Sequence, residues 1–190
     1  MARLSARFDE ALKYAHDIHR DQVRKGTQSP YISHLMGVAS IVLDDGGNED
    51  ESIGALLHDA AEDHGGRARL EEIRSRFGDD VAKIVEDCTD SWESPKRPWV
   101  ERKREYVAHA RSLAPSSLRV SCADKVHNTY AILRDLRNSG DEVWDRFNAS
   151  ADDVVAYYDS LVKAFRHSGG GRLVDELDRI VKGIQREMGY

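Results

Sequence analysis

Apolar residues recur at helical spacing along almost the whole chain, and this periodicity limits the possible fold more than any other feature. A first helix is predicted over residues 5–23, where the recurring apolar positions are Phe8, Leu12, Ala15 and Ile18. No segment keeps the alternation of apolar and polar residues that is typical of a half-buried strand. The sequence therefore predicts an all-α protein.

Glycine and proline residues divide the chain into about nine or ten predicted helices. After the first, these cover residues 34–44, 50–64, 69–77, 80–89, 98–113, 115–137, 150–167 and 173–188. Residues 24–30 form a predicted basic loop, and residues 91–99 form a predicted proline-containing loop. A chain of 190 residues is long enough to bury a substantial core. We therefore expect one compact helical bundle, a single domain over residues 1–190, with its core motifs in 8–135 and its C-terminal helices in 150–190.

The composition of the chain indicates which kinds of binding partner it can have. The net charge of −6 argues against a general nucleic-acid binder, although it leaves room for a local basic pocket that takes a small phosphorylated ligand. Cys88 and Cys122 stand far apart in apolar contexts, so we expect buried thiols and a reducing cytoplasmic location. The chain shows no signal peptide, and no apolar run approaches the ~20 residues that span a bilayer.

The most informative short motif is His58-Asp59, which closes an apolar run and is followed by two more carboxylates, Glu62 and Asp63. On a continuous helix His58 lies above Glu62, and Asp59 lies above Asp63, so the four side chains share one sector. Burying such a group is costly unless a cation compensates it. A divalent metal is the natural candidate.

Two further segments supply matching ligands. His34 precedes a helical stretch, and Asp124 interrupts an apolar run. Two imidazoles and two carboxylates make a plausible four-ligand set that suits Mn, Fe, Zn or Co, and the oxygen ligands favour Mn. A structural zinc site would more often use cysteines, which here are not spaced for it.

His34, His58-Asp59 and Asp124, in this order, resemble the HD-domain metal-dependent phosphohydrolases. Longer motifs are similar to the hydrolase domain of RelA/SpoT proteins over about residues 8–135. These motifs are residues 15–16, 24–25, 30–34, 37–39, 55–59, 62–63, 77–78, 81, 84–85, 89–90, 123–125 and 128. No synthetase domain follows in this chain, which points to the small alarmone hydrolases. The resemblance implies an α-helical fold, one Mn²⁺, and removal of the 3′-pyrophosphate from a guanosine or adenosine alarmone, (p)ppGpp or (p)ppApp.

The resemblance also implies roles for individual residues. The metal ligands would be His34, His58, Asp59 and Asp124. Glu62 and Asp63 would position and deprotonate the attacking water, Arg24 and Lys25 would lie beside the nucleotide, and Asn128 would contact it. The chemistry of the side chains agrees, because arginine and lysine bind polyphosphate and a carboxylate near the metal can accept a proton. Tyr31 could stack on a base.

Some positions depart from the family pattern. Ala61 and His64 replace a valine and a threonine that often flank the acidic pair, and Asn128-Thr129-Tyr130 replaces Asn-x-Arg. Because this arginine is missing, the resemblance does not identify which nucleotide is the substrate. One alternative is an HD-domain phosphatase acting on a nucleoside monophosphate or a phosphorylated dinucleotide. Another is a non-enzymatic, metal-stabilised protein, against which Glu62 and Asp63 argue.

Several other charged residues have no partner pattern in the sequence. Six histidines are interpreted as ordinary surface or core residues: His16, His19, His64, His109, His127 and His167. Lys103 and Arg104 are interpreted as part of a solvated, charged helix face, although this segment also echoes a basic stretch of the small hydrolases.

Overall fold

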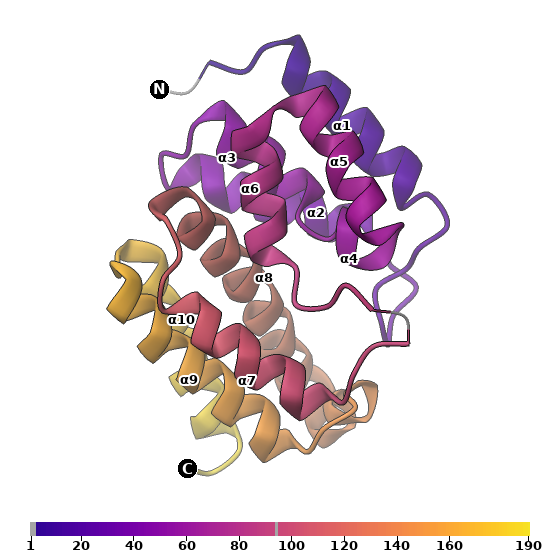
Figure 1. The fold of residues 1–190 in the computed structure, drawn as a ribbon. Coiled ribbons are helices and arrows are strands. Elements are labelled where there is room, and N and C mark those ends of the chain that lie inside the picture. The colour runs from indigo at the N-terminus through magenta and orange to yellow at the C-terminus, as the bar shows by residue number, and fades with distance from the viewer. Residues whose placement is uncertain (1–2, 94) are drawn as a thin grey trace.

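The computed structural model describes residues 3–93 and 95–190, and this part of the chain contains ten α-helices, one 3-10 helix and no strand (Figure 1). The all-α prediction and the expected number of helices are confirmed. Ser94, within the predicted loop 91–99, and Met1-Ala2 lie outside the described residues. The elements are α1 (Ala6–Ile18), α2 (Ile32–Asp44), α3 (Glu49–Leu57), α4 (Ala60–Asp63), α5 (Gly66–Phe77), α6 (Asp79–Cys88), α7 (Trp99–Ala110), α8 (Pro115–Ser139), η1 (Gly140–Arg146), α9 (Ala151–Ser168) and α10 (Arg172–Glu187).

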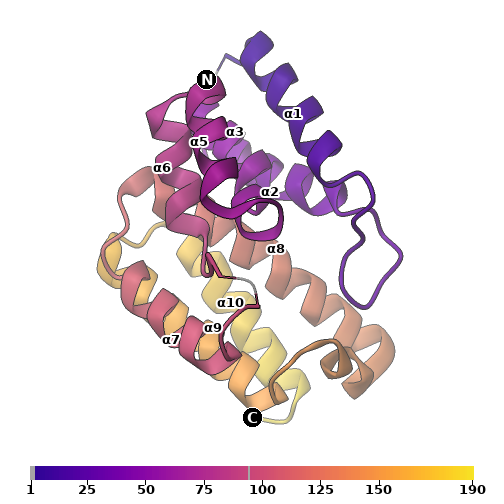
Figure 2. The ribbon, with the colours of Figure 1, turned by 45° about the vertical axis from the view of Figure 1, so that its right-hand side comes forward.

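The helices pack around two hydrophobic clusters that share α8. The first cluster is built mainly from α1 to α6, and the second from α7, α9 and α10. Helix α8 contributes Val120 and Ala123 to the first cluster and Cys122 and Val126 to the second. Figure 2 shows α8 running from the first group of helices into the second. A residue on α8 can therefore face the first group while its helix is held by both.

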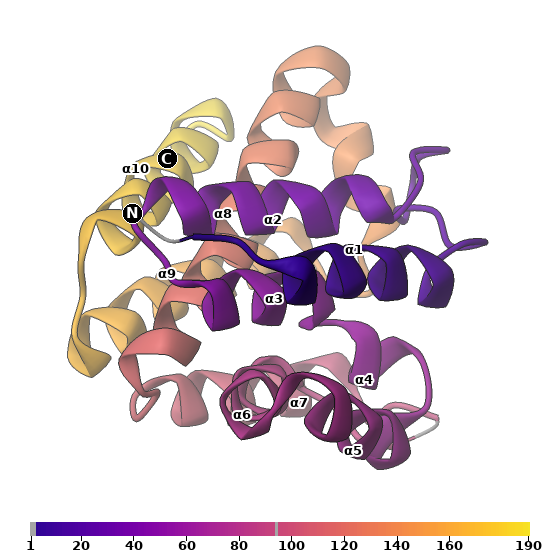
Figure 3. The ribbon, with the colours of Figure 1, turned by 90° about the horizontal axis from the view of Figure 1, so that it is seen from above.

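Seen from above, α1, α2 and α3 run side by side, α6 lies along α3, and α5 packs against α6 (Figure 3). The start of α3 is fixed by a capping box, in which Asn48 accepts from the Glu51 backbone and Glu51 accepts from the Asn48 backbone. Cys88 and Cys122 are buried free thiols, as expected. Among the described residues, no helix combines the length and the apolar character needed to cross a membrane.

The predicted end of the first helix was wrong, and one short helix was not predicted. The first helix stops at Ile18 instead of Val23, because residues 22–31 fold back on themselves. The backbone N–H of Arg24 donates to the Ser29 carbonyl at 2.9 Å. An isolated antiparallel bridge joins Val23 to Pro30, and Gly26 lies in the turn between them. The long helix ends at Ser139, close to the predicted end near residue 137, and η1, which was not predicted, follows it directly. Both differences fall on the cleft described below.

Candidate active site

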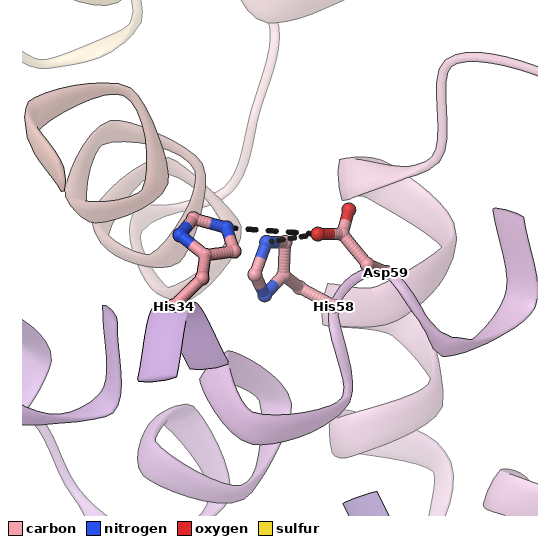
Figure 4. Close-up of side chains that lie close together, drawn as sticks. All are labelled: His34, His58 and Asp59. Atoms are coloured by element: carbon pink, nitrogen blue, oxygen red, sulfur yellow. Dashed lines mark ion pairs between the residues drawn. The ribbon is translucent and has the colours of Figure 1, made fainter. Parts of the chain in front are cut away.

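Four predicted metal ligands meet at one point, and three of them are drawn in Figure 4. His34 comes from α2, His58 and Asp59 from the junction of α3 and α4, and Asp124 from α8. His34, His58 and Asp59 each offer one ligand atom, and these atoms lie within 4.8 Å of one another. Asp124 Oδ1 lies 3.2 Å from His34 Nε2 and 3.6 Å from His58 Nε2. The structure thus brings together residues that are up to 90 positions apart in the sequence.

The neighbouring residues His58 and Asp59 can meet because the helix breaks between α3 and α4. The continuous helix predicted over residues 50–64 is therefore wrong: α3 ends at Leu57 and α4 begins at Ala60. Successive side chains on an α-helix diverge by about 100° around its axis. At the break His58 Nε2 lies 3.0 Å from Asp59 Oδ2, so both side chains point to the same place.

The environment of His58 fits a metal ligand. Its Nδ1 lies 2.8 Å from the Ala55 carbonyl oxygen, which can only accept, so Nδ1 carries the proton and Nε2 keeps its lone pair. Nε2 is buried and makes no hydrogen bond in the described structure, although Asp59 is close. A buried nitrogen lone pair without a partner is costly, and a cation bound by it would remove that cost. The donor set of two imidazoles and two carboxylates fits a divalent ion of the first transition row.

Asp124 is held in place by neighbours on its own helix. Lys125 donates to Oδ2, and the Asn128 amide donates to Oδ1 at 2.5 Å. Burial opposes ionisation, but the charge of Lys125 and the two imidazoles hold the pKa of Asp124 well below its usual range. Asp124 is therefore an ionised carboxylate and can act as an anionic ligand.

Tyr31 is already engaged by two neighbouring side chains, Asp59 and His19. Its hydroxyl donates to Asp59 Oδ2 at 2.6 Å, and its ring stacks on the His19 ring with centroids 5.2 Å apart. The hydrogen bond orients the Asp59 carboxylate. Tyr31 also lines the cleft, and stacking on a nucleotide base stays a prediction.

Glu62 and Asp63 lie on α4, and one lysine contacts both. Lys96 Nζ is 2.6 Å from Glu62 Oε1 and 3.4 Å from Asp63 Oδ1. Glu62 Oε2 accepts from the Asp90 backbone at 3.0 Å, while Asp63 Oδ2 accepts from the Gln22 amide at 2.9 Å. Burial and the charge of Asp90 raise the pKa of Glu62, and Lys96 partly offsets this rise. A raised carboxyl pKa is a property of many general bases.

A cleft of about 560 Å³ opens beside these groups, and its walls carry cations from two parts of the chain. One group follows α6: Lys96, Arg102 and Lys103. The other comes from the loop before α2, the end of α8 and η1: Arg24, Lys25, Arg134 and Arg146. Apolar wall is supplied by Trp99, Ile132, Phe147 and Tyr158. The cleft is therefore basic although the chain as a whole is acidic.

The solvated-face interpretation of Lys103 was wrong, whereas Arg104 is exposed. Lys103 and Arg102 both bind the Asp90 carboxylate, Arg102 at 2.6 Å. The Asp90 side chain is only 5% exposed, but the charge of Lys103 lowers its pKa to about 2. This buried carboxylate holds two cations at the wall of the cleft.

The predicted substrate-binding residues also line the cleft. Arg24 donates to Asn128 Oδ1 at 2.9 Å and contacts His127 Nδ1 at 3.1 Å. Lys25 donates to Asn148 Oδ1 at 3.2 Å. Arg24, Lys25 and Asn128 are thus brought together, and their contact with a nucleotide stays a prediction.

Lys96 and His127 are among the site residues that were not identified from the sequence. Lys96 sits in a proline-containing loop where no spacing relates it to Glu62, and His127 was interpreted as an ordinary histidine. Burial is the main cause that lowers the pKa of His127 to about 4, and the charge of Arg24 acts in the same direction, so its imidazole is neutral at neutral pH. The available signal for His127 was its place one helical turn after Asp124.

Comparison with known proteins agrees with this arrangement. The HD domain family model matches residues 11–155. Guanosine-3′,5′-bis(diphosphate) 3′-pyrophosphohydrolase MESH1 of Xenopus tropicalis is 41% identical over 160 residues, covering 83% of each chain. The Homo sapiens MESH1 protein is 38% identical over 147 residues, covering 76% of this chain and 77% of its own.

A solved structure shows the same similarity at the level of the fold. It is described as a metazoan ortholog of SpoT that hydrolyzes ppGpp and plays a role in starvation responses. It superposes with a TM-score of 0.78 at 29% identity and covers 98% of both chains. The chain therefore belongs to the HD-domain family, and within it to the hydrolases that include these pyrophosphohydrolases. Membership implies a divalent metal, and His34, His58 and Asp59 could hold one.

Proposed function

We propose that this chain is a metal-dependent alarmone hydrolase that removes the 3′-pyrophosphate from (p)ppGpp or (p)ppApp. One divalent cation would be held by His34, His58, Asp59 and Asp124. We propose Mn²⁺, because the hard carboxylate oxygens of this ligand set favour it. The observation that carries the proposal is the convergence of these four side chains around the unpartnered Nε2 of His58, beside a basic cleft. The named activity of the MESH1 relatives supports the same reaction.

The reaction is a hydrolysis at the phosphorus that carries the 3′ oxygen. The oxygen of water forms a bond to this phosphorus, and the bond between the phosphorus and the 3′ oxygen breaks. The 3′ oxygen takes a proton, and pyrophosphate is released. A divalent cation, when bound, supplies a more acidic water and withdraws charge from a phosphoryl oxygen. Glu62 accepts the proton of the attacking water, and Asp63 assists in orienting it.

The two groups of cations in the cleft would bind different phosphate groups of the substrate. Lys96, Arg102 and Lys103 lie on the side of Glu62 and are placed to neutralise the diphosphate that is cleaved. Lys25, Arg134 and Arg146 lie on the other side of the cleft, where Arg134 and Arg146 both pair with Asp135, and would bind a second phosphorylated position. Two groups of cations favour a substrate with phosphate at two positions over a nucleoside monophosphate.

A phosphorylated dinucleotide also carries phosphate at two positions. Because Thr129-Tyr130 stands where the family pattern has an arginine, a phosphatase acting on such a dinucleotide is the second candidate. The products separate the two reactions. Cleavage of an alarmone at the 3′ oxygen releases pyrophosphate, whereas a phosphatase releases orthophosphate.

The test is a substrate panel with purified protein and Mn²⁺. It includes guanosine and adenosine alarmones, a phosphorylated dinucleotide and nucleoside monophosphates, with pyrophosphate and orthophosphate measured separately. The proposal expects fastest turnover of an alarmone and release of pyrophosphate, abolished in His58→Ala. Orthophosphate as the sole product would establish the phosphatase. No turnover of any substrate with metal bound would support the non-enzymatic alternative.

We further propose that residues 1–190 act as one hydrolase domain in the cytoplasm. The support is that α8 carries Asp124 and contributes to both hydrophobic clusters, so that the N-terminal and C-terminal helices hold the same site.

A further inference from the structure

We propose that His127 is a positioning residue for the metal site: it fixes the tautomer and the orientation of His34, and Gly37 provides the space that it needs. The inference goes beyond the proposed reaction but depends on His34 being a ligand in the proposed function. It concerns a histidine that the sequence pattern did not single out.

The starting observation is a chain of three side chains. His127 Nδ1 lies 3.1 Å from a guanidinium nitrogen of Arg24 and 3.0 Å from His34 Nδ1. Both contacts converge on the same nitrogen of His127. Arg24 also donates to Asn128, so the guanidinium is fixed at two points.

The protonation of both imidazoles follows from the arginine. A guanidinium has only N–H donors, so His127 Nδ1 must accept from Arg24 and cannot itself carry a proton. The proton of a neutral His127 ring is then on Nε2. Because His127 Nδ1 carries no proton, His34 Nδ1 is the donor in the second contact, and the single lone pair of His127 Nδ1 is shared by the two donors.

The consequence for His34 is a defined ligand geometry. With its proton on Nδ1, His34 keeps the Nε2 lone pair, and Nε2 lies 3.2 Å from Asp124 Oδ1 and 3.6 Å from Asp59 Oδ2. His58 reaches the same state through the Ala55 carbonyl. The two imidazoles are thus fixed by different partners, one by the backbone and the other by the side chain of His127.

Gly37 completes this arrangement from the opposite helix. It lies three residues after His34 on α2, so both occupy one face of that helix. A Cβ atom at Gly37 would lie 2.3 Å from His127 Nε2 and 2.4 Å from His127 Cδ2. Such distances are far below van der Waals contact, so any larger residue would displace the His127 ring.

The test measures Mn²⁺ affinity from the EPR signal of the free ion. His127→Phe keeps a ring but has no acceptor, so affinity should fall by about 10- to 100-fold, the usual effect of losing such a partner. His127→Asn should stay close to wild type, because the asparagine oxygen is as many bonds from Cα as Nδ1 is. His127→Gln places its amide farther out and should not rescue. His167→Phe, at an exposed position on α9, is the matched control.

A second variant leaves His127 in place. Gly37→Ala should also weaken Mn²⁺ binding, and it should add little further loss in the His127→Ala background, where the clash is gone. In addition, ¹⁵N NMR of the metal-free protein should find the His34 proton on Nδ1 and the His127 proton on Nε2. Thermal unfolding of each variant shows that it is folded.

The outcomes separate this inference from the proposed function. Wild-type affinity in both His127→Phe and Gly37→Ala, or a proton on His127 Nδ1, would overturn the role of His127 and leave the hydrolase proposal intact. A wild-type protein that binds no divalent cation would overturn both.

Discussion

The ammonium of Lys96 lies 2.6 Å from Oε1 of Glu62, at the edge of the cleft. The contact places a positive charge against the carboxylate that is proposed to accept the proton from water. Burial and Asp90 raise the pKa of Glu62, and Lys96 acts in the opposite direction. Lys96 therefore helps to keep Glu62 ionised, and only an ionised carboxylate can serve as the base.

Lys96→Met should lower kcat/KM and move its acidic limb to higher pH. The sign follows from the charges: without Lys96 the pKa of Glu62 rises further, so the active ionised form is lost at a higher pH as the solution is acidified. The measurement is kcat/KM against pH with saturating metal. Lys13→Met, on the exposed side of α1, is the control. An unchanged acidic limb in Lys96→Met would contradict the role given to Lys96.

Glu62→Gln should leave the metal bound while kcat falls. Glutamine keeps the shape of the side chain and removes the proton acceptor, and a positioned base contributes about 10²–10⁴-fold. Asp63→Asn should have a smaller effect, because Asp63 is held by Gln22 and is the assisting group. Metal content and single-turnover rates check both variants. If Asp63→Asn shows the larger loss, the two roles are exchanged.

His58→Ala and Asp124→Ala should strip the metal and abolish turnover. Each change removes a ligand, and His58→Ala also removes the unpartnered nitrogen at the centre of the cluster. Metal analysis after gel filtration gives the occupancy. Incubation of the wild type with a chelator should reproduce the loss, and added Mn²⁺ should restore activity in the wild type alone. Full occupancy in both variants would show that the ligand set is wrong.

Gly54→Ala should lower the free energy of unfolding by about 1–3 kcal/mol, the usual cost of overpacking a filled core. Its Cβ would lie 2.7 Å from Cγ2 of Ile84, where α3 packs on α6. Gly183→Ala is the matched control, since its Cβ would meet the end of the Leu133 side chain at 3.1 Å. Urea unfolding followed by circular dichroism compares the two, and an equal effect would contradict the crowding argument.

The all-α class could be predicted because helical periodicity is a local property of the sequence, and glycines and prolines divide it into helices. The four ligands could also be found, because His58-Asp59 is a distinctive pair and His34 and Asp124 complete its chemistry. The break that lets His58 and Asp59 point together was not predictable in this way. No glycine or proline stands between Ala55 and His64, so local preferences favour a continuous helix there.

Contacts between distant segments account for the rest. Lys96 meets Glu62 across 34 positions, and His127 meets His34 across 93. Neither pairing leaves a periodic trace in the sequence, because each depends on how α8 and the 91–98 loop pack against the first group of helices. A lysine in a loop and a histidine on a helix look ordinary until their partners are known.

Arg24→Ala tests a residue with two separable roles. If Arg24 binds the polyphosphate, KM should rise by roughly ten- to a hundredfold, since a charge-assisted contact contributes about 1.5–3 kcal/mol. This rise should shrink for substrates with fewer phosphates. Arg24 also contacts His127 and donates to Asn128, which holds Asp124, so Mn²⁺ affinity should fall as well.

Lys25→Ala is the control for Arg24, because Lys25 lines the same cleft but donates to Asn148 and touches neither His127 nor Asn128 among the described contacts. Lys25→Ala should therefore raise KM and leave Mn²⁺ affinity unchanged. KM measured at saturating Mn²⁺, together with a separate metal titration, resolves the two effects. If Arg24→Ala changes metal affinity but not KM at saturating metal, Arg24 belongs to the support of the ligands and the nucleotide is bound by other cations of the cleft.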